Sequence, residues 1–369
     1  MVLNIGEKIK MLRKQQNVTQ EKLADYLSIS YQAVSKWENG SALPDITLVP
    51  GIANFFGVSS DELLGMREDE NIEELKQYEN MYQENNRLGR VLDNIKLSRK
   101  VLAKYPRNYQ WMLNLSYALV QYTATKEQEQ YSKENGFMEE AISLCEKIRE
   151  DCTIDSFRQG ATQILCYNYP QIGKTDKAIE LANEMPEMII SKEALLSRIY
   201  TGEEEIKQNQ ENLIQMIDMC CGIFVELSSD RVLGKDLSFE DKIKFIEASN
   251  TLYQTIFQND EDSLFYACRL CRNYNRLAEL WCATGDNTIV MNYLLLAEKT
   301  ARVYDECSKL GKQKYKSIFA NRCTYNPKNS GKNWEGTELS MLYHRTTESV
   351  FNNLRDIPEF IELQKRLKQ

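Results

Sequence analysis

Apolar residues recur at helical spacing along almost the whole chain, and short polar turns separate these periodic stretches. The first stretch runs from Ile5 to Gln16, with Ile9 and Leu12 on its apolar side. Glycine (16) and proline (7) are scarce among the 369 residues. Because both residues disfavour helix interiors, this scarcity favours helices over sheets. No strand is predicted, and the pattern indicates an all-α protein.

Capping signals define the next two helices. Thr19 is placed to cap the second helix, and Ser30 is placed to cap the third. The third helix is expected over Tyr31–Glu38, with Val34 and Trp37 three residues apart on its buried side. These two apolar residues are expected to belong to a core, because large apolar side chains are usually buried.

Two further helices are predicted before residue 65. Asn39-Gly40 ends the third helix, since these residues tolerate left-handed backbone. A fourth helix follows Pro44-Asp45, and it is expected to begin late or bend at Pro50, which lacks a backbone donor. A capped fifth helix is expected at Ser60–Leu64.

Length and charge then divide the chain. A chain of 369 residues is too long for one ordinary core. We expect a head (residues 1–65), a charged linker (66–75) and a helical body (76–369). The net charge is −8, yet residues 1–36 carry +3, which leaves −11 for the remainder. A basic head can bind nucleic acid locally while the acidic body repels nonspecific contact.

The motifs of the head resemble those of the XRE (Cro and phage-repressor-like) helix-turn-helix family. The similarity covers nearly all of residues 5–65, and it is carried by Thr19-Gln20-Glu21-Lys22-Leu23-Ala24, Ser30 to Gly40, Pro44-Asp45 and Phe56-Gly57-Val58-Ser59. The resemblance implies a five-helix domain whose third helix enters the major groove of double-stranded DNA. The residues that it implies as DNA contacts are Gln20, Ser30, Tyr31, Gln32, Ser35, Lys36 and Asn39.

The side-chain chemistry of these positions suits their implied roles. Gln32 can pair with adenine through two hydrogen bonds, and Lys36 can donate to guanine or to a phosphate. Tyr31 can contact a thymine methyl group or a phosphate. Gln20 and Asn39 flank the helix pair, where they would hold the DNA backbone and set the register.

Other charged residues of the head have structural interpretations. Arg13 and Glu38 match family positions that pair with each other, and we interpret them as an internal ion pair. Lys8, Lys10 and Lys14 are expected to form a solvated face of the first helix, with phosphate contact as the alternative.

An internal repeat organises the body. Gly136 to Ile142 and Gly173 to Ile179 align with each other, Gly285 to Met291 gives a third copy, and Asn85 to Val91 gives a degenerate first one. These segments resemble tetratricopeptide (TPR) repeats, which implies helix hairpins stacked into an α-solenoid with a concave groove. Residues 187–260 fit the repeat poorly.

A helix-turn-helix head joined to such repeats resembles the peptide-sensing regulators of Gram-positive bacteria. The resemblance implies a short peptide or protein ligand in the groove. A homodimer assembled through the body is predicted as well, because one head covers only about half a turn of groove and the long body offers the larger faces for pairing. Four polar residues on repeat-like helices are candidate effector contacts, with ordinary surface or turn positions as the alternative: Asn168, Asn250, Tyr253 and Asn273.

Two other classes of function compete with a transcription regulator. The first is a protein–protein adaptor, in which the head only localises the body to DNA. The second is an enzyme, which the single histidine, His344, disfavours. The pair Cys268 and Cys271 suggests metal or redox chemistry, but buried structural thiols are the commoner case.

No cofactor and no metal are therefore predicted. No apolar stretch of 18 residues exists, so a membrane span is not expected. The N-terminus also lacks the apolar region of a signal peptide. We expect a cytoplasmic protein whose ten cysteines are mostly reduced.

Overall fold

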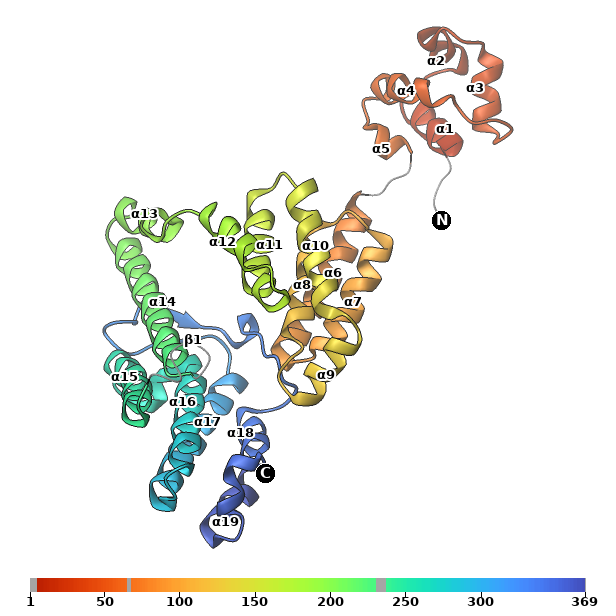
Figure 1. Cartoon of the computed structure of the whole chain (residues 1–369). Helices are drawn as coiled ribbons and strands as arrows, with labels where there is room; N and C mark the ends of the chain where they lie inside the picture. Colours follow the sequence, from red (N-terminus) through yellow and green to blue (C-terminus); the bar gives the residue numbers. More distant parts are fainter. Residues whose placement is uncertain (1–4, 65–67, 230–236, 369) are drawn as a thin grey trace. The chain divides into compact units, whose positions relative to one another are not determined.

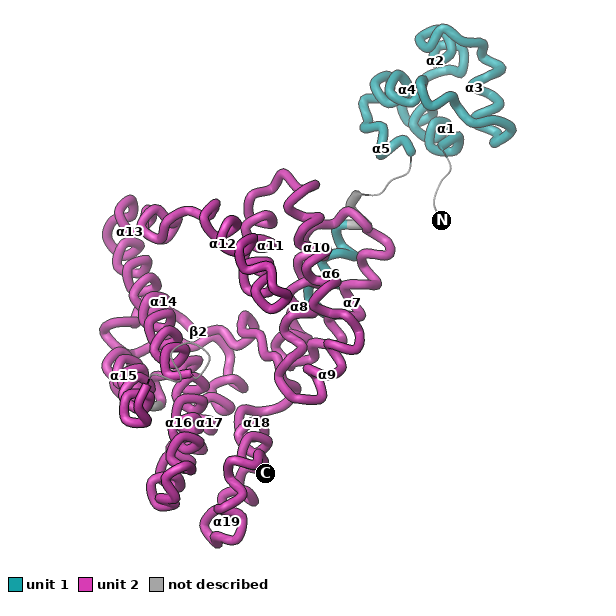
Figure 2. Tube along the Cα trace, viewed as in Figure 1, with its two compact units in different colours: residues 1–81 teal, residues 82–369 magenta. Residues whose placement is uncertain are grey.

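The computed structural model describes residues 5–64, 68–229 and 237–368. Helices make up nearly all of the regular structure in these ranges (Figure 1), which confirms the all-α fold. A short antiparallel pairing of β1 (Gln313–Lys314) with β2 (Thr324–Tyr325) is the exception, and the prediction that the chain has no strand is wrong there. The chain forms two compact units, residues 1–81 and 82–369 (Figure 2).

The head contains the five predicted helices. Their bounds are α1 (Ile5–Gln15), α2 (Gln20–Leu27), α3 (Tyr31–Glu38), α4 (Val49–Phe56) and α5 (Ser60–Leu63). A short 3-10 helix, η1 (Ile46–Leu48), leads into α4. Pro50 lies in the first turn of α4, where its missing N–H would have had no helical partner. The helix therefore begins just before the proline instead of bending at it.

The turn between α2 and α3 uses two different caps. The Thr19 hydroxyl accepts a hydrogen bond from Lys22 N at 3.2 Å, which caps α2. Ser28 ends α2 in the left-handed conformation with φ of 56°. Ser30 occupies the N-cap position of α3, but its side chain makes no capping hydrogen bond. The prediction that Ser30 caps α3 holds for its place in the backbone and is wrong for its hydroxyl.

All five helices contribute to one small core in the head. One apolar residue from each helix is completely buried: Ile9, Leu23, Val34, Ile52 and Leu63. Trp37 is 5% exposed and packs in the same cluster. A fully buried side chain of this size contributes about 1.5–3 kcal/mol. Because no helix can bury its apolar side alone, the five helices depend on one another.

Helix α6 (Glu68–Leu88) follows the head. Residues 68–75, which the sequence analysis assigned to a linker, lie within this helix, and residues 1–4 and 65–67 lie outside the described residues. The boundary between the two compact units, after Met81, also falls within α6. Glutamate, glutamine and asparagine dominate the stretch without any glycine or proline, so polarity there does not prevent helix formation.

The second unit is a succession of helices joined by short turns. Its α-helices are α7 (Val91–Lys104), α8 (Tyr109–Gln121), α9 (Lys126–Glu134), α10 (Phe137–Asp151), α11 (Asp155–Asn168), α12 (Thr175–Asn183), α13 (Lys192–Ile199), α14 (Glu203–Leu227), α15 (Phe239–Phe257), α16 (Ala267–Cys282), α17 (Asn287–Lys309), α18 (Glu338–Thr346) and α19 (Pro358–Leu367). The 3-10 helices are η2 (Tyr169–Ile172), η3 (Met188–Ile190), η4 (Asp260–Tyr266), η5 (Pro327–Asn329) and η6 (Ser349–Leu354). Neighbours in sequence pack as pairs, including α7 with α8, α10 with α11, α14 with α15 and α16 with α17.

The predicted TPR-like turns have the expected backbone and burial. The repeat glycines lie between paired helical segments with positive φ: Gly136 (64°), Gly173 (75°) and Gly285 (76°). Such backbone favours glycine because it has no Cβ. Five residues after each glycine, a small or branched side chain is buried in the next helix: Ala141, Ala178 and Val290. These short side chains allow the two helical segments on either side of each turn to pack closely.

The packing is uneven along the second unit. Helices α8, α10 and α11 share one apolar core, and helices α14 to α19 share another. Along the chain, a segment that we call the apolar segment (residues 172–223) connects these two cores; it spans α12, η3, α13 and most of α14. Many of its large apolar side chains are exposed: Ile172, Ile179, Met185, Met188, Ile189, Ile190, Leu195, Ile199, Ile206, Met216, Met219 and Ile223.

Candidate nucleic-acid interface

Helix α3 has a buried apolar side and an exposed polar side. Val34 and Trp37 are 0% and 5% exposed. Tyr31 is 51% exposed, and Gln32 and Lys36 are also exposed. Because 3.6 residues make one turn, positions 32 and 36 lie one above the other on the same side of the helix. That side presents an amide and an ammonium group to solvent.

The ends of α3 add further polar groups. Ser30 is exposed just before the helix, and Ser35 is half-buried along it. Asn39 is exposed at the C-terminal end, where its Oδ1 accepts hydrogen bonds from the backbone N (3.0 Å) and hydroxyl of Ser41. Gly40 follows with φ of 78°, which ends the helix. The candidate DNA contacts of α3 therefore lie on and around one helix.

An ionic cluster lies beneath this helix. Arg13 Nε donates to Glu38 Oε1 at 2.6 Å and Arg13 Nη2 donates to Glu38 Oε2 at 2.9 Å. Arg13 Nη1 also donates to the carbonyl of Val18 at 2.8 Å. Two parallel hydrogen bonds fix both the distance and the orientation of the two side chains. The cluster ties the end of α3 to the end of α1.

Gln20 belongs to the same cluster. Its Nε2 donates to Glu38 Oε2 at 2.9 Å, so its amide group is directed toward the interior of the head as well as to the start of α2. Burial opposes ionisation of Glu38, but hydrogen bonds from Arg13 and Gln20 hold the pKa of this carboxyl below its usual range. The hydrogen bond to Glu38 likewise raises the pKa of Arg13. The carboxylate is thus charged and fully engaged at neutral pH.

The lysines of α1 differ in their surroundings. Lys8 Nζ lies 3.2 Å from Glu62 Oε1, and the Lys8 side chain is 19% exposed. Lys10 and Lys14 are exposed. Lys8 therefore links α1 to α5, whereas the other two lysines extend into solvent.

One exposed feature of the head was not predicted from the sequence. The segment after α3, residues 40–47, which runs into η1, exposes Leu43 and Ile46, whose side chains are 74% and 71% accessible. Its start is fixed by hydrogen bonds from Ser41 N and Ala42 N to the carbonyl of Lys36. The signal available in the sequence was the pair of apolar residues around Pro44, which fits no helical period.

Three of the four candidate effector contacts lie together in the second unit. Asn273 Nδ2 donates to Asn250 Oδ1 at 2.8 Å and to Ser249 Oγ at 2.9 Å. The Tyr253 hydroxyl donates a hydrogen bond to Asp218 Oδ1 at 2.6 Å. The three candidates Asn250, Tyr253 and Asn273 are buried, so they are neither surface nor turn residues. Their hydrogen bonds join α15 to α14 and α16.

Asn168 lies apart from the other three. It is 6% exposed at the end of α11, and its Nδ2 donates to the carbonyl of Ile164 at 2.7 Å. It also lines a cavity of about 580 Å³ bounded by α8, α9, α10 and η2. A cavity of this volume lies within the range of small-ligand sites.

The cysteine pair of α16 lies in the interior of the second unit. Cys268 and Cys271 are both buried, and burial raises the pKa of the Cys268 thiol to about 11. Within the described ranges, no group of three or more His, Cys, Asp or Glu residues is arranged to hold a metal ion. In those ranges, too, every helix is too short or too polar to span a membrane.

Comparison with known sequences centres on the head. The pattern of the helix-turn-helix family matches residues 9–63. An uncharacterized HTH-type transcriptional regulator of Methanocaldococcus jannaschii is 38% identical over 63 residues, which cover 17% of this chain and 96% of that protein.

Two bacterial relatives extend the comparison. The HTH-type transcriptional activator BcrR of Enterococcus faecalis is 32% identical over 126 residues, or 33% of this chain and 60% of that protein. A prophage-derived HTH-type transcriptional regulator of Bacillus subtilis is 39% identical over 59 residues, or 16% of this chain and 55% of that protein. The chain thus spans less than two thirds of either relative.

One solved structure is similar over most of the chain. It is Bacillus thuringiensis PlcR in complex with the peptide PapR7 and DNA, which matches 83% of this chain and 96% of its own. The sequence identity is 14% and the TM-score is 0.33.

Proposed function

The chain belongs to the helix-turn-helix family of transcriptional regulators, and from this premise we propose that it binds a specific DNA duplex with α3 in the major groove. The proposed contacts are those that surround α3 and the start of α2: Gln20, Ser30, Tyr31, Gln32, Ser35, Lys36 and Asn39. The proposal implies a cytoplasmic location, where the ten cysteines would remain reduced.

The observation that carries the proposal is the division of α3 into two sides. The apolar residues of α3 are buried in the core, and Glu38 is bonded within the ionic cluster. Gln32 and Lys36, by contrast, are exposed to solvent. Because α3 is packed on the core of the head, its backbone is already ordered before binding, and only the exposed side chains lose freedom there. They also have the chemistry to read bases: an amide for adenine and an ammonium for guanine or phosphate.

Within this arrangement each group has a proposed role. Gln32 and Lys36 read base edges, and Tyr31 contacts a thymine methyl group or a phosphate. Gln20 begins α2, where backbone N–H groups and the helix dipole favour a phosphate. Asn39 fixes the loop that follows α3, so it holds the register on the DNA backbone.

Genome-wide mapping of bound fragments, followed by titration of the recovered site at several salt concentrations, tests the proposal. We expect affinity for the recovered site to exceed nonspecific affinity by about 10³-fold or more and to fall steeply with salt. A flat salt dependence, or equal affinity for every fragment, would contradict DNA recognition by this head.

We further propose that the working form is a homodimer assembled through the second unit. One head covers about half a turn of groove, and dimers place two heads on half-sites about 34–36 Å apart or a multiple of that. The apolar segment supports this proposal, because exposed apolar side chains gain free energy when another protein surface covers them. Light scattering on the full chain at micromolar concentration should give twice the mass of 43.0 kDa. A monomeric mass would contradict the dimer.

An effector is proposed for the same unit, as a short peptide or protein ligand near Asn168. The other three candidate residues already bond to one another or to Asp218, so an effector there would have to displace internal hydrogen bonds. Thermal unfolding of the full chain in a low-mass cell extract tests this. We expect a rise in Tm that protease treatment of the extract abolishes and that Asn168→Ala reduces. No rise in Tm would contradict a peptide effector.

A further inference from the structure

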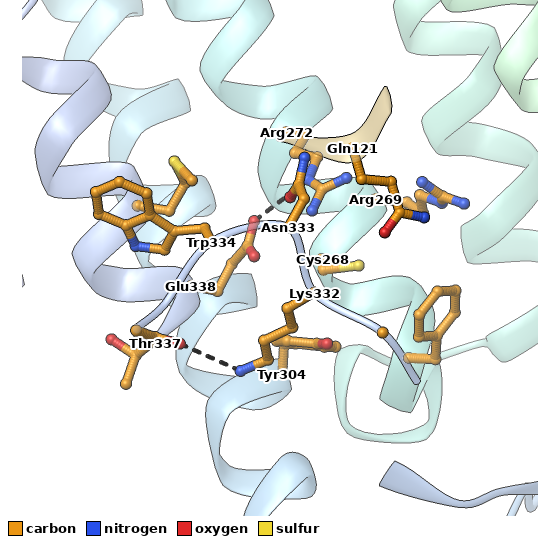
Figure 3. Close-up of a pocket in the computed structure, with 14 residues that line it drawn as sticks. Gln121, Cys268, Arg269, Arg272, Tyr304, Lys332, Asn333, Trp334, Thr337 and Glu338 are labelled. Carbon is orange, nitrogen blue, oxygen red and sulfur yellow. Dashed lines mark hydrogen bonds and ion pairs between the residues drawn. The ribbon is translucent and has the colours of Figure 1, made fainter. Parts of the chain in front are cut away.

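A second cavity in the body is lined mainly by polar and positively charged groups. Its volume is about 380 Å³, and it lies between α16, α17, the start of α18 and a loop that we call the strap (residues 331–337) (Figure 3). Gln121, at the end of α8, closes another side. This volume suits a molecule of metabolite size, at the small end of the range for ligand sites.

Three cationic side chains line this cavity against one carboxylate. Arg269 and Arg272 come from α16, Lys332 comes from the strap, and Glu338 opens α18 (Figure 3). The chain as a whole carries −8. Burial raises the pKa of Cys268, a further lining residue, to about 11, so its thiol brings no negative charge. The lining is therefore positive within an acidic protein.

The three cationic side chains differ in how many of their hydrogen-bond donors already have a partner. Arg269 bonds to both oxygens of Asp218, at 3.2 and 3.3 Å. Arg272 Nε lies 3.5 Å from Glu338 Oε1. This nitrogen atom is buried and makes no hydrogen bond, although the Arg272 side chain as a whole is 41% exposed. Lys332 Nζ donates a long hydrogen bond to the carbonyl of Gly336, at 3.4 Å, and lies 5.4 Å from the centre of the Tyr304 ring. An unsatisfied buried donor is costly, and an oxyanion in the cavity would remove that cost at Arg272.

The strap is held in place from two sides. At the start of the second unit, Lys332 N donates to the carbonyl of Asn86 at 2.8 Å, and Arg90 Nε bonds to Glu335 at 2.9 Å. A Cβ built on Gly89 would lie 1.9 Å from Trp334 O, so only glycine permits this approach. On the other side, Trp334 Nε1 donates to Ser340 Oγ at 3.3 Å. The strap thus forms a defined wall, which places Lys332 opposite the two arginines.

We propose that this cavity binds a small organic oxyanion, a phosphate monoester or a carboxylate, between Arg272 and Lys332. The charged head of the ligand accepts hydrogen bonds from these two side chains, and its organic part lies against the aromatic rings of Trp334, Tyr304 and Phe265. The proposal does not depend on DNA recognition, because every residue in it lies in the second unit.

Calorimetric titration of the full chain tests the proposal in two arms. One arm uses phenyl phosphate and the other uses benzoate, each against sodium chloride at equal ionic strength and without DNA. Binding in one arm only identifies which oxyanion the cavity takes. Because the basic head can also attract anions, the site is identified by variants. Arg276→Gln is the matched control, since Arg276 also lies on α16 and has a similarly exposed side chain, but pairs with Glu279 outside the cavity.

The variants have opposite expected signs. Arg272→Gln and Lys332→Gln should each weaken binding about tenfold or more, through loss of a charge-assisted hydrogen bond. Glu338→Gln should strengthen binding several-fold, because it removes the competing negative charge. Arg276→Gln should leave affinity unchanged. If the Arg272→Gln variant does not fold, the affinities of the Lys332→Gln and Glu338→Gln variants still test the proposal.

Three results would overturn the proposal. They are no saturable binding of either probe, equal loss of affinity in the Arg276 control, and weaker binding to the Glu338→Gln variant. None of these results bears on DNA binding by the head, which is measured with duplex DNA.

Discussion

Helix α3 of the head and the apolar segment of the second unit expose opposite kinds of surface. On α3 the apolar residues and the one carboxylate face inward, and an amide, a phenol and an ammonium group face outward. In residues 172–223 the packing is thinner, and isoleucine and methionine side chains face outward instead. Each region has helical periodicity, so the pattern alone does not distinguish their partners.

The contrast shows that the side chains which a helix does not bury in its own core indicate which kind of partner the helix can bind. Polar groups that a well-packed domain leaves exposed keep their hydrogen-bonding capacity for a polar partner such as DNA. Apolar groups left exposed gain free energy only when another surface covers them. The same chain therefore offers one surface suited to nucleic acid and another suited to protein.

The largest effect is expected from removing the centre of the head core. Trp37→Ala should destabilise the head by about 3–5 kcal/mol, from lost burial and the cavity that remains. Denaturant unfolding measures the loss, and the variant should keep wild-type base preference in whatever fraction stays folded. A stable head with altered base preference would assign Trp37 to the DNA-contacting side and break the contrast between the two sides of α3.

A somewhat smaller effect is expected from the ionic cluster. Glu38→Gln should cost about 2–3 kcal/mol, because the hydrogen bonds to charged Arg13 are weakened. The folded pKa of Glu38 is lowered, so its contribution to stability is present above the ordinary value of 4.5 and is lost as the pH falls through the lowered value. Denaturant unfolding of the head between pH 7 and pH 3 should show a steeper acid loss for wild type than for the variant. Parallel pH profiles for the two proteins would show that protonation of Glu38 does not cause the loss of stability at acid pH.

The DNA-reading residues should affect binding without affecting folding. Gln32→Ala and Lys36→Ala should each cost about 1–3 kcal/mol in affinity and relax specificity at one base position. Lys14→Ala serves as the control, because Lys14 is exposed on α1 and is expected to alter specificity at no position. Fluorescence anisotropy with single-base variants of the site measures both quantities. Unchanged selectivity in both test variants would exclude α3 as the reader.

The smallest effect is expected in the apolar segment. Ile189→Glu should weaken dimerisation by about 1 kcal/mol or more, because it places a charge in the proposed interface. Leu310→Glu is the control, since Leu310 is also largely exposed (60%, against 69% for Ile189) but follows α17, outside the segment. Analytical ultracentrifugation measures the dissociation constants. Equal values for the two variants would separate the apolar segment from dimer formation.

The sequence by itself determined the elements of the head almost completely. Caps, glycines and apolar spacing are local signals, so they located five helices, including α3 over Tyr31–Glu38, and the side of α3 that is buried. The same kind of signal identified Gly136, Gly173 and Gly285 as turns between paired helices. Residues 68–75, predicted as part of a charged linker, form the first turns of α6, because the stretch has no glycine or proline to oppose a helix.

Only the tertiary structure decided where side chains from distant elements meet. The Ser30 hydroxyl makes no capping bond, Gln20 turns to Glu38, and Asn250 and Asn273 bond to each other inside the second unit. The cavity between Arg272 and Lys332 joins residues 60 positions apart in the chain. Spacing fixes which side of a helix a residue occupies, but its partners depend on how whole helices pack, and that is decided by the summed burial of many residues rather than by any one motif.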